Sequence, residues 1–146
     1  RLSSRGVRAA FALGDAMPDS PVRRLRAAGL KLGTVSNTAH TASEKVAWLA
    51  ARGLAPGLWD VFLASSDEGM TKAHPAIFTR ALDTLGVAAG TCGYVAHATG
   101  ELRTAQEVGL VTIAFLPDDY AVEADYHAGS FYELGDRILE ARESPR

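Results

Sequence analysis

Four segments of the chain share one order of residues: a helix-like stretch, a glycine, and then a short apolar run. The glycines are Gly29, Gly53, Gly86 and Gly109. A glycine just past a helix adopts the left-handed backbone conformation that closes the last turn at little steric cost. The interval between successive glycines matches one strand plus one helix, so the pattern predicts a series of α/β repeats.

Helix-start signals stand upstream of these glycines. They are Ser20-Pro21, the capping-box pair Thr41 and Glu44, the dipeptide His74-Pro75, and Thr99, which we expect to act as an N-cap. Hydroxyl side chains satisfy the free N–H groups of a first helical turn, and proline fits the first helical position. A last helix is predicted from about Phe131 to Ala141.

Four short apolar runs lie between the predicted helices: Lys31–Val35, Trp59–Ala64, Cys92–Ala96 and Val111–Phe115. Apolar runs that alternate with helices are typical of parallel strands buried on both faces. Right-handed crossovers between such strands build a three-layer α/β sandwich around a mainly parallel sheet. We therefore predict a Rossmann-like α/β fold, with residues 1–146 forming a single domain.

Composition narrows the classes of function. The net charge of −2 and the lack of long Lys/Arg blocks argue against a nucleic-acid binder. No apolar run approaches the length of a membrane span, so we expect no membrane association. Cys92 is the only cysteine, which excludes a disulfide framework and a cysteine-based zinc site. A reducing, cytoplasmic location is the expectation that follows.

Candidate functional residues follow from the predicted sheet. Ligands of open parallel sheets bind beyond the carboxyl ends of the strands. In this chain those ends lead into Ser36-Asn37, residues 65–72 and residues 97–101. We expect these three segments to converge at one edge of the sheet.

Each of these residues taken singly also has a plainer interpretation. Ser36-Asn37 is typical of a strand end that enters a turn. Lys72 is compatible with a solvated lysine near a helix start. Glu101 is favoured in a first helical turn by the helix dipole alone. Only the combination of the sites supports a functional interpretation.

Together the three strand ends resemble the haloacid dehalogenase-like superfamily of phosphohydrolases. Residues 25–37, which end in Val35-Ser36-Asn37, resemble the second motif of that family, a strand ending in Ser or Thr. Residues 72–78 resemble the third motif, a lysine just before a helix, and residues 94–112 stand where the fourth belongs. The resemblance covers roughly residues 18 to 116.

What the resemblance implies is phosphoryl chemistry, in which catalysis consists mainly of positioning the group and neutralising its charge. It implies that Ser36, Asn37 and Lys72 bind phosphate and that Lys72 also assists catalysis as a compact cation. Family members use an aspartate nucleophile, an aspartate acid/base two residues later, and acidic ligands for Mg²⁺. On this chain the resemblance makes Asp15 a catalytic candidate, and Asp15 and Glu101 the candidate metal ligands.

Two motifs depart from the family pattern. In the fourth, Ala96 and His97 stand where family members usually have Gly-Asp, and Glu101 is the remaining acid. Imidazole suits softer metals, so we expect Mg²⁺ binding to be weak or absent. In the first, Leu13 occupies the position of the nucleophile and Asp15 that of the acid/base. A leucine side chain cannot attack phosphorus, so the first motif is degenerate or missing.

Residues 5–17 admit two interpretations. Their alanines favour a helix, which would be the tail of a cap domain, whereas alternating apolar residues favour a strand. In the strand order of the family, the first strand lies between the second and the fourth, and an empty slot would leave backbone groups unpaired. We therefore predict a strand over residues 7–13. The short interval from Leu13 to Ser36 leaves no room for a substantial cap.

Two functions compete on these grounds. In the first, a phosphohydrolase-type domain keeps Ser36 and Lys72, lacks the nucleophile, and serves binding or regulation. In the second, the chain is an active Mg²⁺-dependent phosphomonoester hydrolase. Its nucleophile is then Asp15 or an aspartate from a segment upstream of Arg1.

Both functions predict phosphate or a small phosphorylated molecule as the partner. A protein partner or a second copy of the chain is a further expectation, through Trp48, Trp59 or Tyr132 where these are exposed.

Overall fold

A parallel sheet of six strands forms the centre of the computed structural model, which describes residues 9–11 and 21–143. The strand order is β3-β2-β1-β4-β5-β6, and each neighbouring pair runs parallel. The strands are β1 (Ala9–Phe11), β2 (Lys31–Ser36), β3 (Val61–Ala64), β4 (Cys92–Ala96), β5 (Val111–Phe115) and β6 (Tyr126–Ala128).

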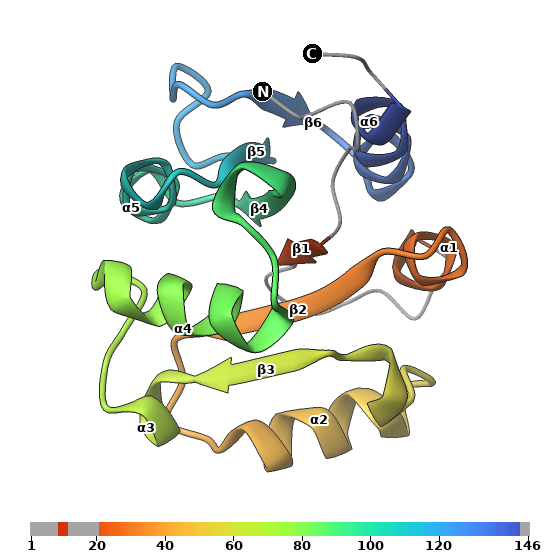
Figure 1. The fold of residues 1–146 in the computed structure, drawn as a ribbon, viewed down its shortest axis with the longest axis vertical. Helices are drawn as coiled ribbons and strands as arrows, with labels where there is room; N and C mark the ends of the chain where they lie inside the picture. Colours follow the sequence, from red (N-terminus) through yellow and green to blue (C-terminus); the bar gives the residue numbers. More distant parts are fainter. Residues whose placement is uncertain (1–8, 12–20, 144–146) are drawn as a thin grey trace.

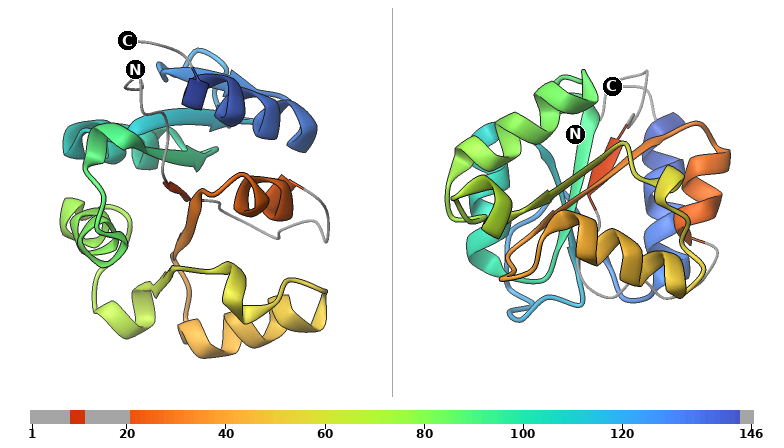
Figure 2. Two further views of the ribbon diagram at one scale, coloured as in Figure 1. Left: turned by 45° about the vertical axis from the view of Figure 1, so that its right-hand side comes forward. Right: turned by 90° about the horizontal axis from the view of Figure 1, so that it is seen from below.

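Helices cover both faces of this sheet. They are α1 (Pro21–Ala27), α2 (Ala42–Ala51), α3 (Ser65–Glu68), α4 (Pro75–Leu85), α5 (Thr99–Val108) and α6 (Phe131–Glu143), with short 3₁₀ turns η1 (Pro56–Leu58) and η2 (Ala89–Thr91). Figure 1 and both views of Figure 2 show α4 and α5 together on one side of the strands and α1 and α6 together on the other. The predicted three-layer α/β sandwich is confirmed.

Two apolar clusters, one on each face, hold the layers together. Tyr94 of β4 packs with Phe78 of α4 in the first cluster, with ring centroids 4.8 Å apart. The next residue of the strand, Val95, belongs to the second cluster together with Leu25 of α1 and Ile138 of α6. Successive residues of a strand point to opposite faces. A strand covered on both faces therefore needs the continuous apolar run that the sequence shows.

The central slot of the sheet is occupied by β1. Ala9 pairs with Lys31 of β2 on one side and with Cys92 of β4 on the other. The prediction of a strand rather than a helix is therefore confirmed for residues 9–11. The rest of the predicted strand, including Leu13, lies outside the described residues.

Local turn chemistry behaves largely as expected. Gly29, Gly53, Gly86 and Gly109 all have positive φ angles. The Thr41 and Glu44 capping box is present at the start of α2. The N-cap prediction for Thr99 is wrong: Ala98 is the N-cap of α5 and Thr99 is its first residue. The helix starts there because the carbonyl of Ala98 accepts the N–H of Leu102.

The sequence prediction also missed the edge strand β6. Three residues carry too short an apolar pattern to stand out from a loop, and pairing with β5 creates the strand. No cap domain is present among the described residues, since each helix and strand there belongs to the sheet or its flanking layers.

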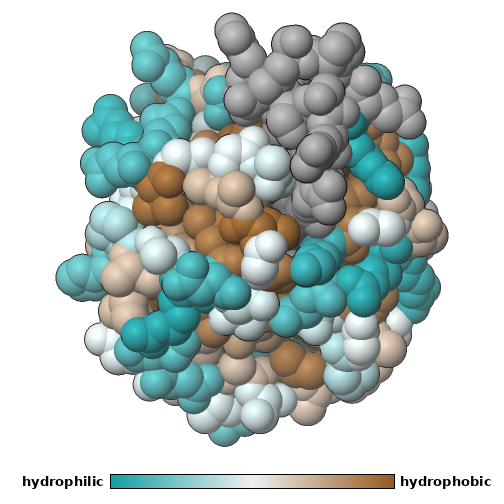
Figure 3. Space-filling model, in the orientation of Figure 1, coloured by the Kyte–Doolittle hydropathy of each residue, from teal (hydrophilic) through white to brown (hydrophobic). Residues whose placement is uncertain are grey.

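Exposed large hydrophobic side chains are scattered over several elements. Trp48 of α2 and Tyr132 of α6 are exposed, as are Leu116 and Tyr120, whereas Trp59 is only partly exposed. Figure 3 shows hydrophilic residues around the outline of one face and apolar residues near its centre. None of the helices in the described ranges has the length and apolar character of a membrane span.

Candidate functional site

The three predicted segments meet at the carboxyl edge of the sheet. Ser36 is the last residue of β2 and pairs in register with Ala64, the last residue of β3. Parallel strands deliver their carboxyl ends to one edge, so the loops that follow β2, β3 and β4 become neighbours. Side chains from all three loops contact one another there.

Two sets of hydrogen bonds join the loop after β2 to the segment after β3. The Asn37 Oδ1 atom accepts from the backbone N–H of Lys72 at 2.8 Å. The Ser65 hydroxyl accepts from the Thr38 N–H at 2.8 Å and donates to the Thr38 carbonyl at 3.0 Å. The position of Lys72 is therefore set by a side chain that is 35 residues away in the sequence.

Lys72 is buried and is held by Glu101. Its Nζ atom lies 2.9 Å from Glu101 Oε1, with the two side chains 8% and 19% exposed. The other carboxylate oxygen of Glu101 accepts from the Tyr94 hydroxyl at 3.3 Å. Burial lowers the pKa of Lys72, while the hydrogen bond and charge of Glu101 oppose that change. Burial, followed by the Glu101 charge, raises the pKa of Tyr94.

Ser36 has a cationic neighbour that the sequence analysis did not identify. The Nζ atom of Lys45 donates to Ser36 Oγ at 2.9 Å. Lys45 lies in the first turns of α2, where its N–H bonds to the carbonyl of Thr41. The capping box at residues 41–44 is the sequence signal that places Lys45 on this helix. Its reach to Ser36 depends on how α2 packs beside the sheet.

The structure does not join every predicted residue to this cluster. His97 pairs instead with Asp118, at 3.1 Å between Nδ1 and Oδ1, and both side chains are well exposed. Asp15 lies outside the described residues. Ser36, Asn37, Lys72 and Glu101 are the predicted site residues that the structure places at the common edge.

The described residues at this edge do not fit a Mg²⁺ ion. Mg²⁺ binds hard oxygen ligands in near-octahedral geometry. Both oxygens of Glu101 are engaged, by Lys72 and by Tyr94. Within the described part of the chain, no three His, Cys, Asp or Glu side chains gather as a metal site.

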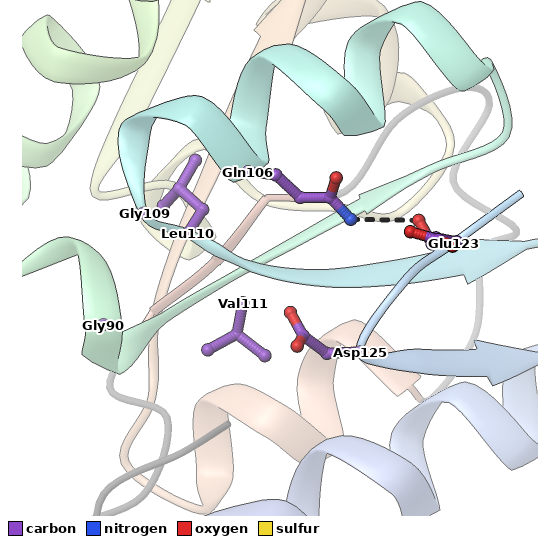
Figure 4. Close-up of a pocket in the computed structure, with 7 residues that line it drawn as sticks. All are labelled: Gly90, Gln106, Gly109, Leu110, Val111, Glu123 and Asp125. Carbon is purple, nitrogen blue, oxygen red and sulfur yellow. Dashed lines mark hydrogen bonds between the residues drawn. The ribbon is translucent and has the colours of Figure 1, made fainter.

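A separate hollow of about 480 Å³ lies at the opposite edge of the sheet. Its lining comes from η2 before β4, from the end of α5 and the start of β5, and from the segment before β6: Gly90, Gln106, Gly109, Leu110, Val111, Glu123 and Asp125. Figure 4 shows Gln106 reaching across the hollow, where its Nε2 atom donates to the Glu123 main-chain oxygen at 2.9 Å. This hollow is distinct from the cluster around Lys72, because it lies at the amino ends of the strands.

Comparison with known families identifies a match over most of the chain. A family model described as haloacid dehalogenase-like hydrolase matches residues 7–109. That range includes Ser36, Asn37, Lys72 and Glu101. No curated protein matches the chain.

Solved structures share the fold. A haloacid dehalogenase-type (HAD) phosphatase from Thermococcus onnurineus is 26% identical, with a TM-score of 0.70 over 85% of this chain and 57% of that one. A HAD-superfamily hydrolase from Ehrlichia chaffeensis is 17% identical, with a TM-score of 0.69 over 83% of this chain and 55% of that one. The present chain thus spans a little over half the length of these two structures.

The match to an uncharacterized protein from Corynebacterium glutamicum covers a larger share of the matched chain than the two matches above. That protein is 19% identical, with a TM-score of 0.64, and the match covers 92% of this chain and 91% of that chain. The likeness therefore extends over nearly the whole length of both chains.

Proposed function

The chain belongs to the haloacid dehalogenase-like hydrolases, and from this membership we propose that it binds phosphate or a small phosphorylated molecule at Ser36, Asn37 and Lys72 without hydrolysing it. The observation that carries the proposal is the engagement of Lys72 with Glu101. This ion pair engages the Glu101 carboxylate, which the family resemblance makes a candidate metal ligand.

Hydrogen-bond donors at the carboxyl edge support anion binding. Asn37 uses its Oδ1 atom toward Lys72, which leaves the side-chain NH₂ group as a donor. Ser36 supplies a hydroxyl, and Lys72 supplies an ammonium group. Charge-assisted hydrogen bonds to oxyanions are short and strong, and they require donors rather than a nucleophile.

The departures from the family motifs support binding without turnover. By the family resemblance, Leu13 takes the position of the nucleophile, and His97 stands where family members have a metal-facing aspartate. Asp15 is the remaining carboxylate of the first motif. An active Mg²⁺-dependent phosphatase that uses Asp15 is therefore the alternative that the experiment has to exclude.

Calorimetry and a turnover assay on the same protein test the proposal. We expect inorganic phosphate to bind the parent, to bind Lys72→Ala much more weakly, and to bind equally well with and without Mg²⁺. We expect no turnover of a generic aryl phosphate in the presence of Mg²⁺. Phosphate binding that is indifferent to the loss of Lys72 would contradict the proposed site.

Asp15→Asn is the control for residual catalysis. Turnover by the parent that disappears in Asp15→Asn would establish the hydrolase in place of the binding domain. Turnover that survives in Asp15→Asn would point to a contaminating phosphatase. The calorimetric comparison of phosphate binding to the parent and to Lys72→Ala would then decide whether the proposed site is correct.

A further inference from the structure

We infer that Lys45 makes this site selective for doubly charged phosphate groups, because it holds the Ser36 hydroxyl as an outward donor and adds a positive charge. The inference rests on the proposed function, since it concerns the ligand charge at the same site. Lys45 is not among the residues predicted from the sequence at this edge, which are Ser36, Asn37, Lys72 and Glu101.

The first step concerns the direction of the Ser36 hydroxyl. An ammonium group has three donors and no acceptor. At 2.9 Å from Lys45 Nζ, the Ser36 oxygen must therefore act as the acceptor. Its own hydrogen points away from Lys45 and is available to an anion. Lys45 thereby sets Ser36 as a donor before any ligand arrives.

The second step concerns the charge balance of the site. The charge of Lys72 is offset by Glu101, 2.9 Å away. Among the described residues, Lys45 pairs with no carboxylate; its interaction there is with the neutral Ser36 hydroxyl. Among the described residues of the site, two ammonium groups and one carboxylate leave a net positive charge, and Lys45 supplies it.

The two lysines are close enough to affect each other. The positive charge of Lys45 contributes to lowering the pKa of Lys72, after the larger effect of burial. A bound dianion relieves this repulsion at both lysines, whereas a monoanion relieves less of it. The arrangement favours the second negative charge of a phosphate monoester.

The helix that carries Lys45 is anchored at its start. The Thr41 capping box fixes its first turn, and the Ala42 N–H bonds to Asp67 Oδ2 at 2.8 Å. These contacts tie α2 to the segment after β3, so Lys45 approaches Ser36 from a positioned backbone. Pre-positioned donors bind an anion without a large ordering cost.

Methyl phosphate and dimethyl phosphate are the probes that test the charge preference. At about pH 8 the first is a dianion, because a phosphomonoester loses its second proton near pH 6, and the second is a monoanion. We expect Lys45→Gln to weaken methyl phosphate binding by about 10- to 100-fold. Binding of dimethyl phosphate should change by no more than about threefold.

Lys31→Met is the matched control, because Lys31 begins β2 at the amino edge of the sheet and its Nζ atom donates to the Leu85 carbonyl. It removes one lysine charge from the same chain, and methyl phosphate should bind this variant as it binds the parent. Lys45→Arg should retain most of the affinity. A Lys45→Gln protein that binds methyl phosphate as tightly as the parent would overturn the inference and leave the proposed function intact.

A second readout needs no ligand. The Lys72 pKa, followed by the chemical shift of its Cε carbon, should rise in Lys45→Gln because a neighbouring positive charge has gone. An unchanged Lys72 pKa would show that the two ammonium groups do not interact, which also overturns the inference. A parent protein that binds neither methyl phosphate nor dimethyl phosphate would refute the proposed function and the inference together.

Discussion

The backbone N–H of Lys72 donates a 2.8 Å hydrogen bond to the Oδ1 atom of Asn37. The bond joins the loop that leaves β2 to the loop that enters α4. Through it, the turn that follows Ser36 positions the backbone of the lysine that pairs with Glu101. The strand end and the lysine therefore behave as one unit.

Asn37→Ala should weaken this unit. The Lys72 N–H loses its acceptor, and we expect the free energy of unfolding to fall by about 0.5–1.5 kcal/mol in urea denaturation. Asn37→Asp keeps an acceptor oxygen and should retain most of the stability, while its added negative charge weakens phosphate binding. Equal destabilisation by both variants would show that the Oδ1 contact does not support the loop.

Lys72→Met should destabilise the protein by leaving Glu101 with the Tyr94 hydroxyl as its described partner. We expect a loss of about 1–3 kcal/mol in the free energy of unfolding, because a buried charged group then lacks its main hydrogen bond. Adding Glu101→Gln should recover part of that loss, since the uncompensated charge is removed. The comparison is the free energy of unfolding of the double variant with those of the two single variants. If Glu101→Gln destabilises the Lys72→Met protein as much as it destabilises the parent, the two side chains act independently.

Cys92 should make the protein less stable at alkaline pH. Burial raises the pKa of its thiol above the ordinary value of 9.0. Above that value the thiol ionises in the unfolded chain but stays protonated in the folded one. The folded state then holds more protons, so stability falls as pH rises, by at most about 1.4 kcal/mol per pH unit.

Cys92→Ala removes this titration and provides the comparison. The stability advantage of the parent over Cys92→Ala should be constant below about pH 8 and should shrink above about pH 9. Urea denaturation of both proteins across this range measures it. Parallel stability curves would mean that the thiol titrates alike in both states.

Thr41→Ala should remove the capping box at the start of α2. The Glu44 N–H, which bonds to Thr41 Oγ1 at 3.1 Å, loses its acceptor. We expect a loss of about 1 kcal/mol in the free energy of unfolding. Thr41→Ser keeps the hydroxyl and should remain close to the parent, and a Thr41→Ala protein as stable as Thr41→Ser would contradict the role of the cap.

Local sequence was sufficient to predict most of the elements. The glycines at positions 29, 53, 86 and 109 mark helix ends because a left-handed residue closes a helix irrespective of what packs on it. The runs at Cys92–Ala96 and Val111–Phe115 match β4 and β5. Such signals depend on residues close together in the chain, which is why they can be interpreted without the fold.

Local sequence alone did not decide between helix and strand at residues 9–11. The same residues suit both, and their pairing with β2 and β4 makes them a strand. Backbone groups in the middle of a sheet need partners on both sides, so the neighbours determine the conformation. The edge strand β6 was missed for the same reason, because its partner β5 supplies the hydrogen bonds that define it.

At the candidate site, the sequence determined which residue types reach the carboxyl edge, and the tertiary structure decided which of them pair. The predicted sheet was enough to place Ser36, Lys72 and Glu101 there. The Lys45 contact with Ser36 and the Tyr94 contact with Glu101 require the placement of α2 and β4 relative to these loops. Hydrogen bonds and ion pairs act over a few ångströms, so they depend on packing between elements that are far apart in the sequence.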